Sequence, residues 1–366
     1  MTLILTDLHH HALAESELML FEDRALLGGS EVYFPFGMDW FEQGFWNFER
    51  SWHGDKVARQ YLLGWWDQAT YPNSDGIVFR ADPRHPWRIQ KGITLAAALA
   101  MKWDFVISSL PHNDEGLYQL AQQTGAHFGV QVGNNVQSSR WDLAEFILSS
   151  STLPSEGLVD PSTWAKVTTA HGKPCVVYHQ EFDTDIFRHE WPPANRREVA
   201  SWVNCFPEGP SYPAFVDFAR ANVDDFDFKV YGAYGTGQPN ELVGGDISFV
   251  PTVAATMRDA RMFWHSKHWS DGYGHTVHNE FSLGRPVLGI PRYYQDKLAG
   301  PLFIDGVTSF DIESRTPDEM LRIMRRLRDD DEYHREISQN AAARFREVVD
   351  FDTEADAIAE MMGGVL

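Results

Sequence analysis

The sequence has 366 residues, of which 43% are hydrophobic and 23% are charged, and its formal net charge is −21. This length predicts two domains of roughly 100–200 residues, and the composition excludes a disordered or fibrous protein. The negative charge repels polyanions such as nucleic acid at long range unless a local basic patch opposes it.

Targeting and redox features are absent from the sequence pattern. No apolar run approaches the roughly 20 residues of a membrane span, and residues 1–11 lack the basic flank and apolar stretch of a signal peptide. Cys175 and Cys205 lack the short spacing of a metal site, which argues against a disulfide framework or a cysteine zinc site. We therefore expect a cytoplasmic protein with no membrane partner, and the sequence indicates no protein partner.

The N-terminal half alternates short apolar runs with amphipathic stretches. Strands are predicted at 3–5, 32–34, 105–107 and 128–132, and helices at about 12–27, 93–101 and 117–124. This alternation predicts a parallel sheet with helices on both faces. The Trp-rich stretch at 39–88 interrupts the pattern, and we interpret it as an insertion or a set of long loops.

A second series of strands and helices is predicted to begin with a strand at 175–178. The following stretch, 182–213, is proline-rich and predicted irregular, apart from a short helix near 197–204 with Asn195 as its cap. Helices are then predicted at 214–221, 253–259 and 275–283, and strands at 228–231, 261–265 and 286–290. Thr316, Pro317 and Glu319 form the signature of a capped helix start, and a last helix is predicted at 353–362.

These patterns predict an α/β protein with two Rossmann-like domains that face each other across a cleft. The N-terminal domain spans 1–165 and carries the Trp-rich insertion, and the C-terminal domain spans 166–340. Residues 341–366 form a helical tail that we expect to pack back on the N-terminal domain. The carboxyl edges of the strands are the expected ligand sites in such sheets.

The segment 271–288, DGYGHTVHNEFSLGRPVL, carries the strongest chemical signal. A glycine loop precedes a predicted helix, whose N-terminus presents free backbone N–H groups and a positive dipole end that suit a diphosphate. Asn279 lies about one turn beyond His275 and is placed to bind a ribose hydroxyl. An ordinary strand–helix turn is the alternative interpretation. The candidate donor-nucleotide residues are Asp271, Gly272, Tyr273, Gly274, His275, Thr276 and Asn279.

This segment resembles the donor motif of GT-B glycosyltransferases of the retaining, glycogen-synthase-like type, written EGFG, four further residues, E, A, then G-x-P-V. Residues 271–274 match the first block, Asn279 falls on the second glutamate, and 284–287 match the last block. Residues 305–308 match the DG-x-T loop of that family, so the resemblance covers roughly 247–362. It implies a GT-B fold and transfer of a sugar from a nucleoside-diphosphate sugar, with a UDP-sugar favoured, to an acceptor hydroxyl.

The sequence departs from the family pattern at charged positions. The two glutamates of the motif are Asp271 and Asn279 here, and the Arg and Lys pair that often neutralises the diphosphate is not found. An amide still forms hydrogen bonds with a ribose diol. His179 and Lys267 are candidate diphosphate contacts, and Arg258 and Arg261 are further substitutes without a motif behind them.

Polar residues follow the first predicted strand, where α/β folds place ligand sites. Asp7, His9, His10 and His11 are candidates for the general base that removes the acceptor proton, because histidine titrates near neutral pH. The alternative is a polar loop with a capping aspartate. His112 and Asp114, after the strand at 105–107, form a second candidate for the same role.

A metal site was weighed at the same segment. His275 and His278, with Asp271 or His265, offer nitrogen and oxygen ligands. The motif resemblance already accounts for this stretch, and GT-B enzymes generally rely on helix dipoles and side chains. The resemblance therefore implies no metal and no cofactor other than the donor substrate.

The acceptor is indicated by a weaker resemblance. Residues 6–24 and 32–40 resemble uncharacterised glycosyltransferase-like proteins of bacteriophages, which implies host cytoplasm and a hydroxylated base of phage DNA as acceptor. That hypothesis requires a basic strip formed by residues such as Arg80, Arg84, Arg88 and Lys91. Without the strip, a saccharide or small-molecule acceptor is the better hypothesis. Two other classes remain open, a sugar-nucleotide epimerase and a non-catalytic binding protein of the same fold.

Overall fold

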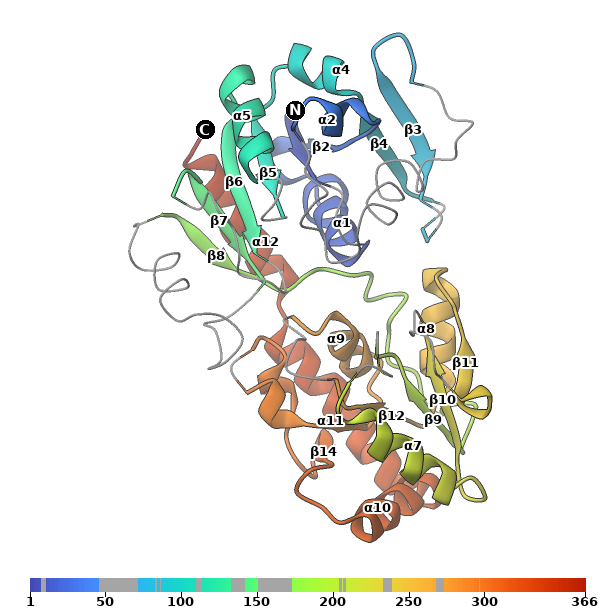
Figure 1. Ribbon diagram of the computed structural model, residues 1–366. Helices are drawn as coiled ribbons and strands as arrows, with labels where there is room; N and C mark the ends of the chain where they lie inside the picture. Colours follow the sequence, from blue (N-terminus) through green and yellow to red (C-terminus); the bar gives the residue numbers. More distant parts are fainter. Residues whose placement is uncertain are drawn as a thin grey trace. The chain divides into compact units, whose positions relative to one another are not determined.

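The computed structural model describes residues 1–7, 11–45, 72–82, 84–85, 87–109, 114–132, 142–150, 173–203, 206, 209–232, 239–267, 273–295 and 297–366. The chain forms two compact units (Figure 1). Unit 1 comprises Met1–Phe182 and Phe351–Leu366, and unit 2 comprises Asp183–Asp350. The sequence pattern predicts these boundaries near residues 165 and 340.

Unit 1 contains an eight-stranded sheet in the order β3-β4-β2-β1-β5-β6-β7-β8. All neighbouring strands are parallel except β3 and β4, which pair antiparallel. The strands are β1 (Thr2–Thr6), β2 (Ser30–Pro35), β3 (Ile77–Ala81), β4 (Ile89–Ile93), β5 (Phe105–Ser108), β6 (His127–Val132), β7 (Phe146–Ser149) and β8 (Cys175–Val177). The helices are α1 (His11–Leu18), η1 (Met19–Asp23), η2 (Leu26–Gly28), α2 (Asp39–Glu42), α4 (Leu95–Ala100), α5 (Asp114–Thr124) and α12 (Phe351–Gly363).

Each face of this sheet has its own apolar core. Leu5, Val106 and Val130 pack with α4 and α5 on one face, while Ile4 and Ile107 point to the other. The C-terminal helix α12 closes that second face through buried apolar residues, Ala355, Ile358 and Met362. Figure 1 draws α12 in red beside β7 and β8. The terminal helix thus completes a core formed by the first strands of the chain.

Unit 2 contains a six-stranded, all-parallel sheet in the order β11-β10-β9-β12-β13-β14. The strands are β9 (Glu198–Ser201), β10 (Asp227–Tyr231), β11 (Val243–Gly245), β12 (Met262–His265), β13 (Val287–Gly289) and β14 (Ser309–Asp311). The helices are α7 (Tyr212–Ala221), η5 (Asn240–Leu242), α8 (Val250–Asp259), α9 (His275–Ser282), η6 (Pro291–Tyr293), η7 (Gly300–Leu302), α10 (Pro317–Asp329) and α11 (Asp331–Val348). In chain order within the unit, this is the 3-2-1-4-5-6 arrangement of Rossmann folds.

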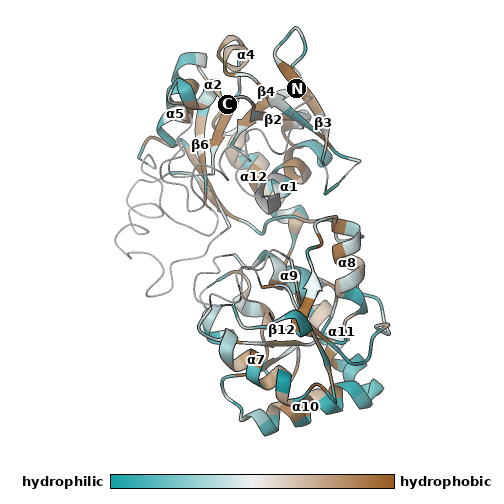
Figure 2. Ribbon diagram, turned by 45° about the vertical axis from the view of Figure 1, so that its right-hand side comes forward, coloured by the Kyte–Doolittle hydropathy of each residue, from teal (hydrophilic) through white to brown (hydrophobic). Residues whose placement is uncertain are grey.

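The structure confirms the helix start that the sequence predicts at Thr316 in unit 2. The Thr316 hydroxyl accepts a hydrogen bond from the backbone N–H of Glu319, and the Glu319 carboxylate accepts one from the backbone N–H of Thr316. This capping box confirms the predicted start of α10. Figure 2 shows the strands mostly brown, while α7 and α10 carry both teal and brown residues. These two helices therefore lay one apolar face on the sheet, as the buried Phe215 and Met324 illustrate.

Two predictions about strands were wrong. Residues 197–204 were predicted as a helix, but β9 pairs with β10 on one side and β12 on the other. Val199 and Ala200 are both fully buried, so a central strand covered on two faces shows no alternation to distinguish it from a helix. Residues 175–178 were predicted to open the second sheet, but β8 pairs with β7 in the first. The sheet to which β8 belongs is decided by its partner strand, and the local sequence pattern does not specify that partner.

Candidate functional site

The two sheets share a topological feature, a switch point at the carboxyl ends of their strands where the strand order changes direction. In unit 2, β9 lies between β10 and β12, so the chain leaves β9 to one side first and to the other side later. Ligands of open α/β sheets bind at such a switch point. In this unit the point lies between Trp202, which follows β9, and Ser266, which follows β12.

Helix α9 begins shortly after β12 and has a firmly held first turn. Gly274, its N-cap, has a φ of +78°, a conformation that glycine adopts without strain. The Nδ1 atom of His278 donates a hydrogen bond of 2.9 Å to the Gly274 carbonyl, and the His278 ring stacks on Tyr273 at 4.2 Å. The first N–H groups of a helix have no partner within it, so this turn presents donors and a positive dipole end.

Asn279 supplies a polar group one turn further along α9. Its side chain is 7% exposed, and among the residues that the structure describes its Oδ1 has no hydrogen-bond partner. A buried acceptor without a donor costs about 1–3 kcal/mol, so such atoms usually meet a ligand or water. Thr276 is only half-buried on the same helix. The helix therefore combines backbone donors with a side-chain acceptor, as a nucleotide diphosphate and ribose require.

A buried network holds α9 from behind, and the sequence analysis missed it. The Glu280 carboxylate lies 3.0 Å from Nδ1 of His265, and Nε2 of His265 lies 2.9 Å from the Tyr294 hydroxyl. All three side chains are almost inaccessible to solvent. Glu280 occupies the position where the family motif has alanine, and that departure was the signal in the sequence. The acid next to Asn279 therefore anchors the helix to β12.

The other residues predicted to bind the donor nucleotide do not gather at the start of α9 within the described part of the chain. Asp271 and Gly272 lie outside the described residues, and Lys267 lies half-buried two residues after β12. His179 belongs to unit 1, where its Nδ1 lies 2.5 Å from the Glu354 carboxylate. Its assignment to the C-terminal domain was wrong, because β8 joins the first sheet.

The arginines that had been weighed as substitutes lie elsewhere. Arg261 immediately precedes β12, at the amino edge of the sheet, and forms an ion pair of 2.9 Å with Asp331. Arg258 lies at the end of α8, and its guanidinium donates to the carbonyl of Ile186. Both side chains therefore support the edge opposite to the start of α9.

In unit 1 the switch point lies between β1 and β5, and a side chain bridges it. Asp7 is 2% exposed, and its Oδ1 accepts a hydrogen bond of 2.6 Å from the backbone N–H of Ser109 and another from the Ser109 hydroxyl. His9 and His10 lie outside the described residues, and His11 begins α1 without a described side chain. The predicted histidine loop therefore follows a strand end that Asp7 ties to β5.

The second candidate for a base is also engaged in structure. Asp114 is fully buried at the start of α5 and accepts a hydrogen bond of 2.7 Å from the Ser108 hydroxyl. His112 lies outside the described residues. Asp114 therefore acts as a link between α5 and β5.

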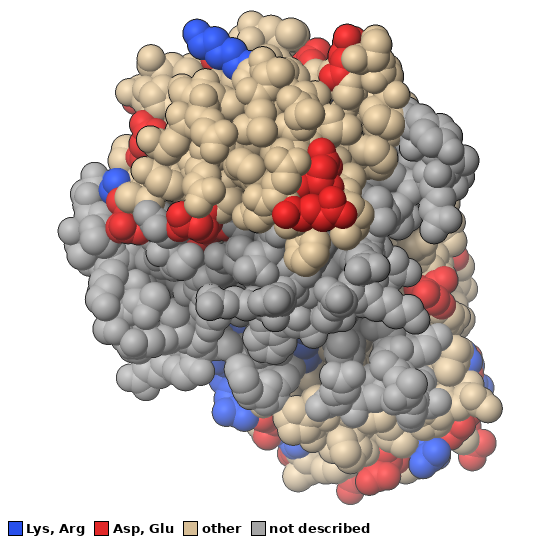
Figure 3. All heavy atoms as spheres, turned by 45° about the horizontal axis from the view of Figure 1, so that its top comes forward, with Lys and Arg blue, Asp and Glu red and all other residues tan. Residues whose placement is uncertain are grey.

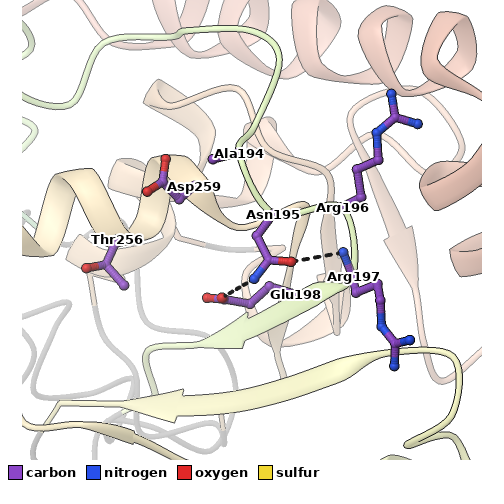
Figure 4. A pocket seen from close by; sticks show the side chains of 7 residues that line it. All are labelled: Ala194, Asn195, Arg196, Arg197, Glu198, Thr256 and Asp259. Atoms are coloured by element: carbon purple, nitrogen blue, oxygen red, sulfur yellow. Dashed lines mark hydrogen bonds between the residues drawn. The ribbon is translucent and has the colours of Figure 1, made fainter.

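A hollow of about 660 Å³ among the described residues does not coincide with the candidate site (Figure 4). It lies at the amino end of β9 and the last turn of α8, lined by Asn195, Glu198 and Asp259 among others. The Asn195 amide donates a hydrogen bond of 2.9 Å to the Glu198 carboxylate. The neighbouring side chains of Arg196 and Arg197 both point away from Asp259. Because ligand sites of parallel sheets lie at the carboxyl edge, this open hollow is not the donor site.

The described residues show neither a metal centre nor a membrane-spanning helix. No group of three or more His, Cys, Asp or Glu side chains within those ranges is arranged to hold a metal ion. Among the helices that the structure describes, none is long and apolar enough to span a bilayer.

Comparisons with known proteins identify the fold. No family model matches the sequence, and no curated protein matches it. Among solved structures, Anabaena HepE in complex with UDP and glucose has 11% identity and a TM-score of 0.63, over 100% of both chains. Sucrose-phosphate synthase from Thermosynechococcus elongatus has 12% identity and a TM-score of 0.60, over 100% of this chain and 99% of that one.

A third structure agrees with these two. The pneumococcal O-GlcNAc transferase GtfA, in complex with UDP and GlcNAc, has 10% identity and a TM-score of 0.59, over 100% of this chain and 99% of its own. At such low identity the likeness shows the fold alone. The chain has two parallel-sheet units of the GT-B type, which confirms the predicted fold class.

Proposed function

We propose that the protein is a glycosyltransferase that moves a sugar from a UDP-sugar to an acceptor hydroxyl. The observation that carries this proposal is the start of α9 near the switch point of unit 2, beside the Oδ1 of Asn279, which has no hydrogen-bond partner among the described residues. UDP is bound in the related structures of Anabaena HepE and pneumococcal GtfA. The motif at 271–288, which resembles the donor motif of that fold, falls on this same helix.

The described residues suggest how the donor is held. Backbone N–H groups at the start of α9 bind the diphosphate and stabilise the charge that develops on it as the sugar leaves. Asn279 accepts a hydrogen bond from the ribose, and the Glu280–His265–Tyr294 network keeps the helix in place. On the acceptor side we assign the base to the histidine loop at 9–11 rather than to Asp7, whose Oδ1 holds Ser109. We propose that no metal takes part.

We propose a saccharide or small-molecule acceptor rather than phage DNA. Lys91 forms an ion pair of 2.7 Å with Glu22, and Arg88 forms one of 2.5 Å with Asp23. These two members of the required basic strip are therefore neutralised by neighbouring acids. In the described part of the face in Figure 3, acidic side chains are scattered over unit 1 and basic ones do not gather into a strip. A polyanion gains little from such a surface.

The donor site is tested by calorimetry with UDP. Asn279→Ala should weaken UDP roughly 5- to 50-fold, because one buried hydrogen bond to the ribose is lost. Asn279→Asp, which keeps an acceptor oxygen, should bind within about 3-fold of the parent. Asn340→Ala, on α11 of the same unit, is the matched control and should leave affinity unchanged. Equal affinity of the parent and Asn279→Ala would show that the site is misplaced.

The reaction is tested with a labelled UDP-sugar. Transfer should require an acceptor, so label should appear in a neutral glycoside and in neither hydroxymethylated nor unmodified duplex DNA at low or moderate salt. Conversion of donor without an acceptor would indicate an epimerase, and nucleotide binding without turnover would indicate a binding protein. Transfer should continue in EDTA. Loss in EDTA that one divalent ion restores would overturn the metal-free proposal.

A further inference from the structure

The chain crosses between the two units twice, and the unit 1 sides of both crossings are tied to each other. The crossings lie at 182–183 and at 350–351. The rings of Phe182 and Phe351 pack edge to face, with their centroids 5.6 Å apart. The backbone N–H of His179 donates a hydrogen bond of 2.7 Å to the Glu354 carboxylate, although the two residues are 175 positions apart. The segments at the two crossings therefore form one packed joint within unit 1.

Arg24 binds both segments from a third element. It directly follows η1, which continues α1. Its Nε donates to both oxygens of the Glu181 carboxylate, at 2.9 and 2.7 Å, and its Nη1 donates a hydrogen bond of 2.6 Å to the Asp352 carboxylate. The hydroxyl oxygen of Ser16 on α1 also accepts a hydrogen bond of 2.9 Å from the backbone N–H of Glu181. We call the ion cluster of Arg24, Glu181 and Asp352 the clamp.

The geometry of the clamp depends on the guanidinium group. Two different nitrogens of Arg24 point at two carboxylates, and the single ammonium of a lysine cannot reproduce both directions. The Glu181 side chain is 10% exposed and that of Asp352 is 86% exposed, so salt screens the second arm far more than the first. A neighbouring cavity, lined by Ser16 and Glu181 among others, measures about 10 Å³ and holds one water molecule at most. The clamp is therefore a joint rather than a ligand site.

We propose that Arg24 is a positioning residue for the sugar transfer, because it fixes both crossings to the helix that begins at His11. This inference rests on the proposed function, which assigns the base to the loop at 9–11. Any movement of unit 2 against unit 1 is absorbed by the backbone at the crossings. The clamp keeps α1 in one orientation during such a movement. Small misplacements of reacting groups slow a reaction strongly, so the clamp acts on turnover and not on UDP binding.

Turnover, UDP affinity and amide exchange of Arg24→Lys test the proposal. This variant keeps the charge but not the two directions, so kcat for transfer from a UDP-sugar to a neutral glycoside should fall about 10-fold. Calorimetry should show a UDP affinity within about 2-fold of the parent. The Glu181 amide should exchange about 10-fold faster, while the amide of Val106 in β5 should exchange as in the parent. Asp352→Asn weakens only the exposed arm and should lower kcat about 3-fold.

Two control variants should leave kcat unchanged. Asp356→Asn removes an exposed acid from α12 outside the clamp, and Arg220→Lys alters an exposed ion pair of unit 2. An unchanged kcat in both Arg24→Lys and Asp352→Asn would overturn the proposal, and so would a loss of UDP affinity equal to the loss of kcat. If Arg24→Lys does not fold, Asp352→Asn decides the outcome. Failure of UDP to bind the parent would refute the proposed function, whereas unchanged exchange of the Glu181 amide would refute the clamp, so the two failures are distinguishable.

Discussion

The two units have the same kind of switch point, and they use it differently. In unit 1, Asp7 at the end of β1 is hydrogen-bonded to Ser109 after β5, so protein groups bridge the switch point. In unit 2, the corresponding strand ends carry Trp202 and Ser266, and among the described residues the indole Nε1 of Trp202 has no partner. The same topology therefore carries different side chains in the two units, bridged by an acid in unit 1 and bordered by an indole in unit 2.

The units also differ in the titratable groups that they bury. Unit 1 buries the acid Glu17, whose raised pKa makes the folded state bind a proton that the unfolded chain releases. Unit 2 buries His334, whose pKa burial lowers to about 3, so there the unfolded chain binds the extra proton in acid. Unit 1 should lose stability as pH rises above the ordinary carboxyl range, and unit 2 as pH falls below the ordinary histidine pKa.

The largest effect is expected at Gly284, which ends α9. It has a φ of +63°, and a Cβ there would lie 2.4 Å from Nδ1 of His189 and 2.7 Å from the Ser338 carbonyl oxygen. Gly284→Ala should lower the free energy of unfolding of unit 2 by about 4 kcal/mol and abolish UDP binding. Gly306→Ala is the matched control, with a φ of +73° and no atom within 4 Å, and should cost about 1 kcal/mol. Urea unfolding measures both, and equal losses would contradict this account of α9.

The next effect is the acid sensitivity of unit 2. His334 donates from Nε2 to the Arg261 carbonyl at 2.8 Å and accepts from the Trp191 indole at 3.1 Å, so it is held neutral. Because its folded pKa is about 3 and its ordinary value 6.5, unit 2 should lose roughly 3 kcal/mol between pH 7 and pH 4.5. Thermal unfolding of His334→Gln should show a flatter dependence over this range. Asn340→Ala, also on α11, changes no titratable group and is the control that should leave this acid branch unchanged. An unchanged slope in His334→Gln would refute the assignment.

Local chemistry explains what was predictable from the sequence. The capping residues of α10 and the glycine loop before α9 act within one turn of the chain, so the pattern of Thr316 or Gly274 was sufficient to place them. The two-unit α/β architecture followed from alternating apolar runs. The alternation fails for β9, because burial on both faces removes the polar side that separates a strand from a helix.

Contacts between distant residues account for what was missed. Glu280, next to Asn279 on the predicted helix, pairs with His265 on β12, and no local pattern specifies that pairing. Asp7 and Ser109 are 102 residues apart and meet because β1 pairs with β5 in one sheet. His179 was assigned to the wrong unit for the same reason. Sheet order, which is a property of the whole chain, decided each of these cases.

A smaller effect on stability is expected at Asp7, which bridges the switch point of unit 1. Asp7→Ala removes the acceptor for the backbone N–H of Ser109 and should lower the free energy of unfolding of unit 1 by about 2 kcal/mol. Asp7→Asn keeps an acceptor oxygen and should lose about 1 kcal/mol. Neither variant should change the UDP affinity, because the bridge belongs to unit 1. A weaker affinity for UDP in Asp7→Asn would show that the crevice of unit 1 also contributes to the nucleotide site.

The smallest effect concerns the indole N–H at the crevice of unit 2. Trp202 is 7% exposed and stacks on Tyr231 at 4.7 Å. Trp202→Phe therefore keeps an aromatic ring and removes part of the ring area together with the indole N–H, which has no partner among the described residues. If the donor serves the bound nucleotide, UDP affinity should fall about 3-fold with little loss of stability. Trp103→Phe in unit 1 is the matched control, because the indole N–H of Trp103 donates a hydrogen bond of 2.8 Å to the Ala98 carbonyl. It should destabilise unit 1 and leave UDP affinity unchanged. Calorimetry measures the UDP affinity of both variants, and thermal unfolding measures their stability. An unchanged UDP affinity in Trp202→Phe would mean that the indole N–H does not form a hydrogen bond with the nucleotide.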